Sequence, residues 1–123
     1  MQSARAEVIL MVETLTAEEL DSLPVGVIQL DRNGTVLQYN ETESSLARTS
    51  RADVIGRDFF TEVAPCTAVR DFQGRFQDGV ARRELDVTFD YQFRFRDDRI
   101  KDVSVSMRYR PESDTVWVVV ERP

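Results

Sequence analysis

The stretch VTFDYQFRF, residues 87–95, alternates between apolar and polar side chains at every position. This period of two predicts a β-strand with one buried face. The segment VSVSMRY, residues 103–109, repeats the alternation, whereas TVWVVV, residues 115–120, is apolar after its first residue. A strand without a polar face is expected at the centre of a sheet, where both of its faces are covered.

Two more predicted strands, VGVIQL at residues 25–30 and TVLQY at residues 35–39, flank the tetrapeptide DRNG. Asn33 and Gly34 are typical of a tight hairpin turn, because both residues tolerate a positive φ. The sequence therefore predicts a hairpin, separated from the three later strands by residues 40–83, which lack strand character.

This intervening segment has the signals of helices. Asn40 can cap a short helix that runs toward Ala47. Ser50 can cap a second helix, which Gly56 would end. A longer amphipathic helix is predicted from three apolar residues at four-residue spacing, namely Phe72, Phe76 and Val80.

The N-terminal segment, residues 1–23, has the pattern of a short helical cap. Apolar residues recur at helical spacing over positions 8–15. Thr16, followed three residues later by Glu19, has the form of a capping box. Pro24 ends the short helix that this box begins.

These patterns together predict one α+β domain over residues 1–123. We expect a five-stranded antiparallel sheet with helices on one side. The N-terminal cap, residues 1–23, is expected to cover the other side, and residues 24–123 form the core of the domain.

The composition excludes several classes of protein. A net charge of −6 over 123 residues argues against a nucleic-acid surface, which needs a basic patch. One cysteine forms no internal disulfide, and there is neither an apolar run of membrane-spanning length nor a secretory signal. We therefore expect a cytoplasmic protein without membrane contact. Because histidine is absent, the commonest general base and metal ligand are missing, and we expect no enzyme.

The only cysteine, Cys66, lies in FFTEVAPCT, residues 59–67. A lone cysteine is most often a small buried apolar residue. Pro65 stiffens the backbone before it, and the polar Thr67 follows it, in a segment without regular structure. These features favour a functional thiol, while the residues alone leave both interpretations open.

Tyr39 and Glu43 form a second candidate pair. If a helix begins near Asn40, their side chains lie on the same side, one turn apart. A carboxyl in an apolar pocket keeps its proton, so a phenol and a carboxyl can both donate hydrogen bonds to a buried anion. The alternative is that the Tyr39 hydroxyl and the Glu43 carboxyl both lie in water.

Four segments, taken in order and at matching distances over residues 20–122, resemble the photoactive yellow protein (xanthopsin) family: LDRNGTVLQYNETE, VIGRDFFTEVAPCT, FQGRFQDGV and FDYQFRF. The resemblance implies a PAS fold and a blue-light photoreceptor. It implies that p-coumaric acid (4-hydroxycinnamic acid) is bound as a thioester to Cys66. In the dark its ionised phenolic oxygen would accept hydrogen bonds from Tyr39 and from protonated Glu43.

The resemblance also implies a cycle. Light turns the chromophore from trans to cis, and its phenolate takes the proton of Glu43. The buried carboxylate that remains drives partial unfolding, largely of the N-terminal cap, and the dark state returns thermally. The implied partners are the covalent chromophore and a downstream signalling protein, with the chain itself a monomer or weak dimer.

Further residues are assigned to the chromophore pocket: Ala47, Arg48, Thr49, Phe59, Val63, Ala64, Pro65, Thr67, Phe93, Phe95 and Asp97. Three positions depart from the family pattern. Ala47 replaces a threonine that bonds the tyrosine, and Thr49 replaces an arginine that covers the pocket, with Arg48 as its candidate substitute. Asp97 replaces a methionine that assists re-isomerisation, which predicts slow thermal recovery.

Two other functions compete with a photoreceptor. One is a PAS-like ligand-binding or interaction domain without a chromophore, which has no need for Cys66, Tyr39 and Glu43 together. The other is a thiol enzyme or redox sensor. No histidine is present to activate the thiol and no second cysteine to resolve its oxidised form.

Overall fold

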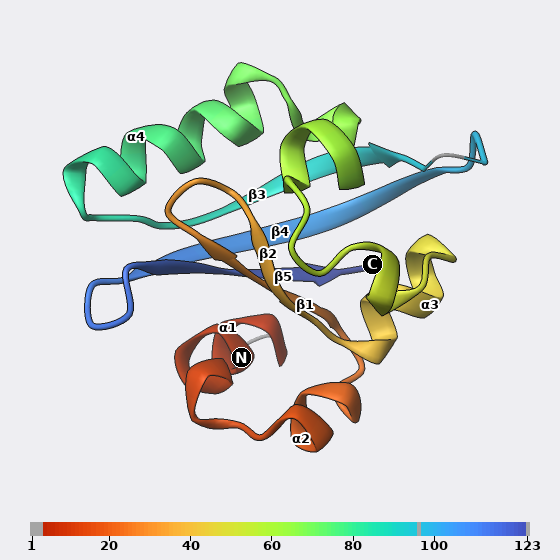
Figure 1. The fold of residues 1–123 in the computed structure, drawn as a ribbon, viewed down its shortest axis with the longest axis horizontal. Helices are drawn as coiled ribbons and strands as arrows, with labels where there is room; N and C mark the ends of the chain where they lie inside the picture. Colours follow the sequence, from red (N-terminus) through yellow and green to blue (C-terminus); the bar gives the residue numbers. More distant parts are fainter. Residues whose placement is uncertain (1–3, 96, 123) are drawn as a thin grey trace.

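A computed structural model describes residues 4–95 and 97–122. Five antiparallel strands form one sheet with the order β2-β1-β5-β4-β3 (Figure 1). The strands are β1 (Gly26–Asp31), β2 (Val36–Tyr39), β3 (Asp86–Arg94), β4 (Ile100–Arg110) and β5 (Thr115–Glu121). The predicted five-stranded antiparallel sheet is therefore confirmed.

Short helices cover both faces of this sheet (Figure 1). The α-helices are α1 (Ala4–Met11), α2 (Ala17–Asp21), α3 (Glu41–Ala47) and α4 (Arg75–Arg82). Single 3-10 turns occupy Val12–Thr14, Arg51–Asp53 and Pro65–Thr67. Two π-helical turns occupy Phe59–Val63 and Arg70–Gly74. Within the described ranges, no helix combines the length and apolarity that spanning a membrane requires.

Strand β5 lies at the centre of the sheet and is buried on both faces, as its apolar sequence predicts. Val116, Val118 and Val120 face the larger core, which α4 and the π-helical turns close. Trp117 and Val119 face the smaller core under the N-terminal segment. The alternation of side chains along a strand thus places one strand in two separate cores.

The N-terminal segment covers the second face, as predicted, although residues 1–3 lie outside the described residues. Val8 and Val12 are buried against the sheet beside Trp117. The capping box is present, because the Glu19 N–H donates to Thr16 Oγ1 and the Thr16 N–H donates to Glu19 Oε1, at 3.1 and 2.9 Å.

The hairpin turn forms by a different mechanism from the one expected. Gly34 has a φ of +89°, but Asn33 is not among the residues with positive φ. Instead the Asp31 carboxylate accepts hydrogen bonds from the N–H groups of Asn33 and Thr35, at 2.8 and 2.9 Å. An aspartate that bonds its own backbone two residues on is a turn device in its own right.

Two predicted helices differ in detail. Ser50 makes no side-chain cap, and only the 3-10 turn Arg51–Asp53 follows it. The amphipathic helix begins as the π-helical turn Arg70–Gly74 and continues as α4, with the predicted face of Phe72, Phe76 and Val80 buried.

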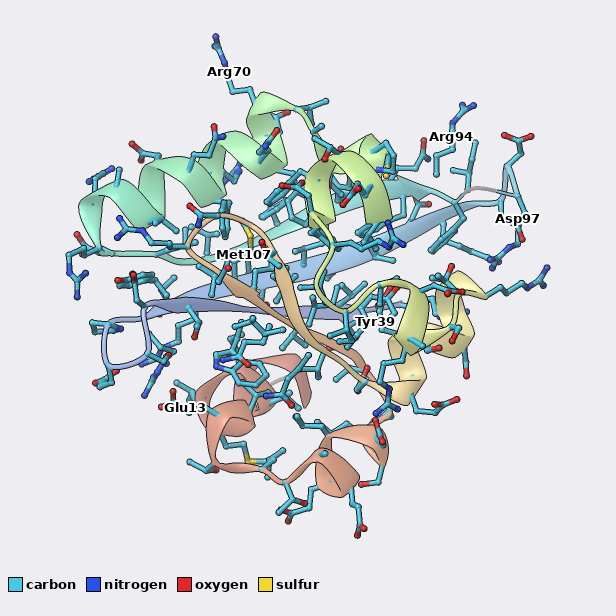
Figure 2. The ribbon with its side chains drawn as sticks, in the orientation of Figure 1. Glu13, Tyr39, Arg70, Arg94, Asp97 and Met107 are labelled. Carbon is cyan, nitrogen blue, oxygen red and sulfur yellow. The ribbon has the colours of Figure 1, made fainter. Side chains whose placement is uncertain are left out.

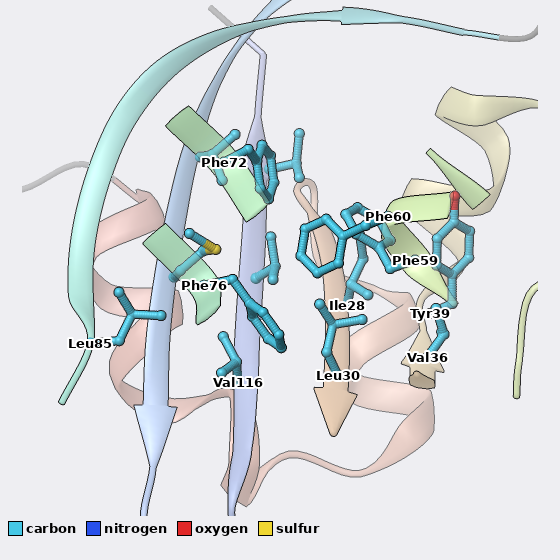
Figure 3. Packing of buried hydrophobic residues seen from close by; sticks show 14 of the residues in the cluster. Ile28, Leu30, Val36, Tyr39, Phe59, Phe60, Phe72, Phe76, Leu85 and Val116 are labelled. Carbon is cyan, nitrogen blue, oxygen red and sulfur yellow. The ribbon is translucent and has the colours of Figure 1, made fainter. Parts of the chain in front are cut away.

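Aromatic side chains fill the larger core (Figure 3). Phe60 packs against Phe76 with ring centroids 5.0 Å apart and meets Phe59 edge to face at 5.2 Å. Tyr39 lies at one end of this cluster, beyond Phe59 (Figure 3). The end of β2 is therefore joined to a water-excluding core.

Candidate functional site

Asn40 fixes the start of α3 and thereby the position of Glu43, the candidate hydrogen-bond donor. Its Oδ1 accepts hydrogen bonds from the N–H groups of Val27 and Glu43, at 2.9 and 3.0 Å. Its Nδ2 donates to the carbonyls of Leu20 and Val25, at 2.7 and 3.0 Å. One buried amide thus joins α3, β1 and the N-terminal cap, as a fully satisfied buried polar group should.

Glu43 points from α3 into the fold and is only 4% exposed. Its Oε1 is buried without a hydrogen-bond partner among the described residues. Burial raises the Glu43 pKa to about 8, although the positive charge of Arg122 acts in the opposite direction. At neutral pH the carboxyl therefore keeps its proton and is a hydrogen-bond donor.

Gly26 makes room for this carboxyl. A Cβ at position 26 of β1 would collide with Glu43 Oε1 and lie 3.1 Å from its Cδ. A glycine inside a strand often marks a place where another group approaches the backbone closely. Here it allows a carboxyl to lie directly against the sheet.

Tyr39, at the end of β2, is 3% exposed. Burial raises its pKa, and the negative charge that Glu43 would carry raises it further. The phenol therefore stays protonated at neutral pH. Tyr39 and Glu43 together are two buried donors of one site.

Both side chains line one small cavity beside the sheet. Its free volume is about 30 Å³, so a bound ring has to displace some of its walls. The lining residues are Tyr39, Glu43, Ala47, Thr49, Phe59, Val63, Ala64, Pro65, Phe93, Arg94 and Phe95. All but Arg94 had been assigned to the site from the sequence. The structure thus brings together residues from β2, α3, the loop before Cys66 and the end of β3.

Cys66 lies in the 3-10 turn Pro65–Thr67, and its thiol is free and half-buried. Cys66 is not one of the residues that line the cavity, but it directly follows Ala64 and Pro65, which do. The Tyr91 hydroxyl donates to the Cys66 carbonyl at 2.5 Å. The backbone of Cys66 is therefore held directly after two residues of the cavity wall.

Three predicted pocket residues lie outside this cavity. Arg48 ends α3 with a φ of +53°, and its side chain is 69% exposed and paired with Asp97 at 3.3 Å. Asp97 lies at the tip of the β3–β4 hairpin (Figure 2), where its hydrogen bond with Arg99 is the main cause that lowers its pKa. Thr67 is buried, but its hydroxyl donates to the Ala64 carbonyl at 2.7 Å. Arg48 and Asp97 therefore hold each other between the end of α3 and the β3–β4 hairpin, whereas Thr67 is held within its own turn.

The sequence did not identify four residues that shape the site: Gly26, Tyr91, Arg94 and Arg99. Arg99 lies 4.7 Å over the Phe95 ring and donates to the Leu46 carbonyl at 3.0 Å, so it ties the hairpin to α3. For Gly26 a signal was present, because glycine is depleted in strand interiors. Arg94 and Arg99 gave no comparable signal. No group of three potential metal ligands occurs in the part of the chain that the structure describes.

Comparison with known proteins defines the class first. The family model described as PAS fold matches residues 14–122. The five-stranded antiparallel sheet with its helices agrees with this class, and the predicted PAS fold is confirmed.

Two related proteins and one solved structure show which family within the PAS class the chain resembles. The chain is 42% identical to photoactive yellow protein from Rhodothalassium salexigens over 85% of this chain and 82% of that protein. It is 41% identical to photoactive yellow protein from Halochromatium salexigens, over 88% and 86%. It superimposes with a TM-score of 0.85 and 42% identity on the photoactive yellow protein domain from the sensor histidine kinase Ppr of Rhodospirillum centenum, over 91% and 97%. The chain belongs to the photoactive yellow protein family of PAS photoreceptors.

Proposed function

We propose that this chain is a blue-light photoreceptor that carries p-coumaric acid as a thioester on Cys66, with Tyr39 and Glu43 as donors to its phenolic oxygen. The observation that carries the proposal is the buried, protonated carboxyl of Glu43, whose Oε1 has no hydrogen-bond partner in the described part of the chain. A buried polar atom without a partner calls for an explanation. An anionic oxygen beside Tyr39 and Glu43 would supply one.

The chemistry of the donors fits an anionic oxygen. A free phenol has a pKa of about 10, so a phenolic oxygen is ionised inside a protein only if donors stabilise it. Hydrogen bonds from the Tyr39 hydroxyl and the Glu43 carboxyl would do so in a site walled by Phe59 and Phe93. The exclusion of water by aromatic walls strengthens such bonds.

When bound, the group would supply a light-driven trans-to-cis isomerisation. The contribution of the chain would then be a single proton, that of the Glu43 carboxyl. Loss of the proton from Glu43 would leave a carboxylate that is 4% exposed, and among the described residues its Oε1 has no hydrogen-bond partner, so the charge of Arg122 offsets only part of the cost of burial. A buried charge without a partner is strongly destabilising, so the surrounding structure opens. Return of the proton restores the dark fold.

We propose that the N-terminal cap transmits the structural change that follows the ionisation of Glu43. Asn40 bonds the Glu43 N–H at one end and the carbonyls of Leu20 and Val25 at the other. Thr42 adds a bond to the Leu23 carbonyl at 2.5 Å. Disturbance of the first turn of α3 therefore loosens the cap directly.

The partner that reads this change would be a signalling protein. The relative from Rhodospirillum centenum is a domain of a sensor histidine kinase. For this chain we propose the same kind of output, a conformational signal without catalysis, from a monomer or weak dimer that binds no nucleic acid.

The proposal is tested by incubating the chain with an activated p-coumaroyl ester and recording intact mass and absorption, in the dark and under blue light. We expect one acyl group per chain and a blue band that bleaches and returns. Cys66→Ser should abolish the band. Glu43→Gln should keep the colour, shift it to the red and weaken the structural response. An unmodified Cys66 without a band would refute the proposal.

A further inference from the structure

Tyr91 is held in one orientation by neighbouring rings of the larger core. Its ring meets Phe72 edge to face, with centroids 5.2 Å apart and planes at 82°. It meets Phe93 in the same way at 5.7 Å and 79°. Such edge-to-face pairs fix ring positions as well as burying area. The hydroxyl of Tyr91 therefore has a defined place at the edge of the sheet.

That hydroxyl donates to the carbonyl of Cys66 at 2.5 Å. We infer that Tyr91 is the positioning residue of Cys66, and that its hydrogen bond holds the turn Pro65–Thr67 so that the thiol is presented for acylation. The acylation part of this inference rests on the proposed function, whereas the positioning part stands on the contact itself.

The remaining hydrogen bonds of the turn are local. The Thr67 N–H and hydroxyl both donate to the Ala64 carbonyl, and the Ala68 N–H donates to the Pro65 carbonyl. Within the described part of the chain, the hydrogen bond of Tyr91 is the only one that joins residues 64–69 to the sheet. Without it, the internal bonds of the turn stay intact, but only the packing of Ala64, Cys66 and Thr67 holds the turn against the core.

The electrostatics keep Tyr91 in its donor form. Burial raises the pKa of Tyr91, and the negative charges of the Cys66 thiolate and of Asp71 raise it further. Because its pKa is raised above the ordinary value, the phenol is protonated at neutral pH and can donate to the carbonyl. The hydrogen bond is therefore present when Cys66 reacts.

The test compares two reagents on Tyr91→Phe, which keeps the ring and removes the hydroxyl. Iodoacetamide is small and reacts with any exposed thiolate, so its rate should rise about fivefold as the turn opens more often. The activated p-coumaroyl ester needs a thiol that is placed at the cavity, so its rate should fall about fivefold. Fivefold is the change that corresponds to about 1 kcal/mol, the typical worth of one hydrogen bond.

Tyr109→Phe is the matched control. The Tyr109 hydroxyl also donates a hydrogen bond of 2.5 Å, to Asp114. This variant loses a comparable bond at a different place and should change neither rate at Cys66. Equal effects of the two variants, or rates that move in the same direction with both reagents in Tyr91→Phe, would show a general loosening and overturn the inference.

A spectroscopic measurement decides the positioning part without any acylation. The carbonyl carbon of Cys66, observed by ¹³C NMR, should move upfield in Tyr91→Phe and stay in place in Tyr109→Phe, because it loses its donor only in the first. An unmoved carbonyl overturns the inference. Should the wild-type chain resist the ester while this shift and the iodoacetamide effect appear, the proposed function fails and the positioning role of Tyr91 stands.

Discussion

Replacing Glu43 with glutamine removes a buried carboxyl whose pKa is about 8, compared with an ordinary value of 4.5. The folded state therefore binds this proton more tightly than the unfolded state does. The contribution of Glu43 to the free energy of unfolding is therefore fully present below pH 4.5 and is lost as the pH rises through about 8. A pKa difference of about 3.5, at about 1.36 kcal/mol for each unit, corresponds to a loss of about 5 kcal/mol.

The assay is urea unfolding of the chromophore-free chain at a series of pH values from 4 to about 9. Glutamine carries no proton to lose, so Glu43→Gln should gain stability relative to wild type as the pH rises, by up to about 5 kcal/mol. Many other carboxyls also titrate, but their contributions to the free energy of unfolding cancel in the difference between variant and wild type.

Glu41→Gln is the control for this experiment. Glu41 lies in the same helix, but its side chain is 62% exposed and pairs with Arg51 at 3.3 Å on the surface. Its effect should stay within about 1 kcal/mol at every pH, as for other surface pairs. A difference between Glu43→Gln and wild type that stays flat across this pH range would refute the buried, protonated state of Glu43.

Three further perturbations follow from the same site. Gly26→Ala should destabilise the chain by about 1–3 kcal/mol in urea unfolding, because the new methyl group displaces the carboxyl of Glu43; an unchanged midpoint would contradict the close approach. Asn40→Ala should cost at least about 2 kcal/mol, since it removes hydrogen bonds to the cap and to α3. The fluorescence of Trp117, the only tryptophan and a residue under the cap, should then shift to the red, and an unshifted spectrum would show that the cap stays docked. In the loaded protein, Asp97→Met should speed thermal recovery after a flash, and equal recovery rates would reject the role assigned to this position.

The sheet was predictable because its signals are local. The alternation in residues 87–95 marks β3, whose apolar face is half-buried except at the buried Phe93. The apolar run at 115–120 marks β5 as central. The capping box at Thr16 was equally local. The hairpin was predicted in the right place, and only the positive φ expected at Asn33 was wrong, because the Asp31 carboxylate satisfies the backbone of the turn.

The polar contacts of the site were less predictable because they join distant parts of the chain. The spacing of Tyr39 and Glu43 suggested a shared side of one helix turn, and both residues do line one cavity. The fit of Gly26 against Glu43 and the bond from Tyr91 to Cys66 depend on how strands and loops meet in space. No periodicity along the sequence encodes either contact.

Under the proposed function, energy magnitudes explain why the loss of one proton from Glu43 would be enough for a signal. A small domain has a free energy of unfolding of about 5–15 kcal/mol in total. A buried carboxylate that costs about 5 kcal/mol in the folded state therefore changes the structure around it. The response need not be global. The cap is held by its own small core, by an ion pair between Glu13 and Arg110, and by the bonds through Asn40. Because Asn40 also caps the helix of Glu43, the cap shares an anchor with the ionising group, while most of the larger core does not. We therefore expect the cap to detach before the sheet opens.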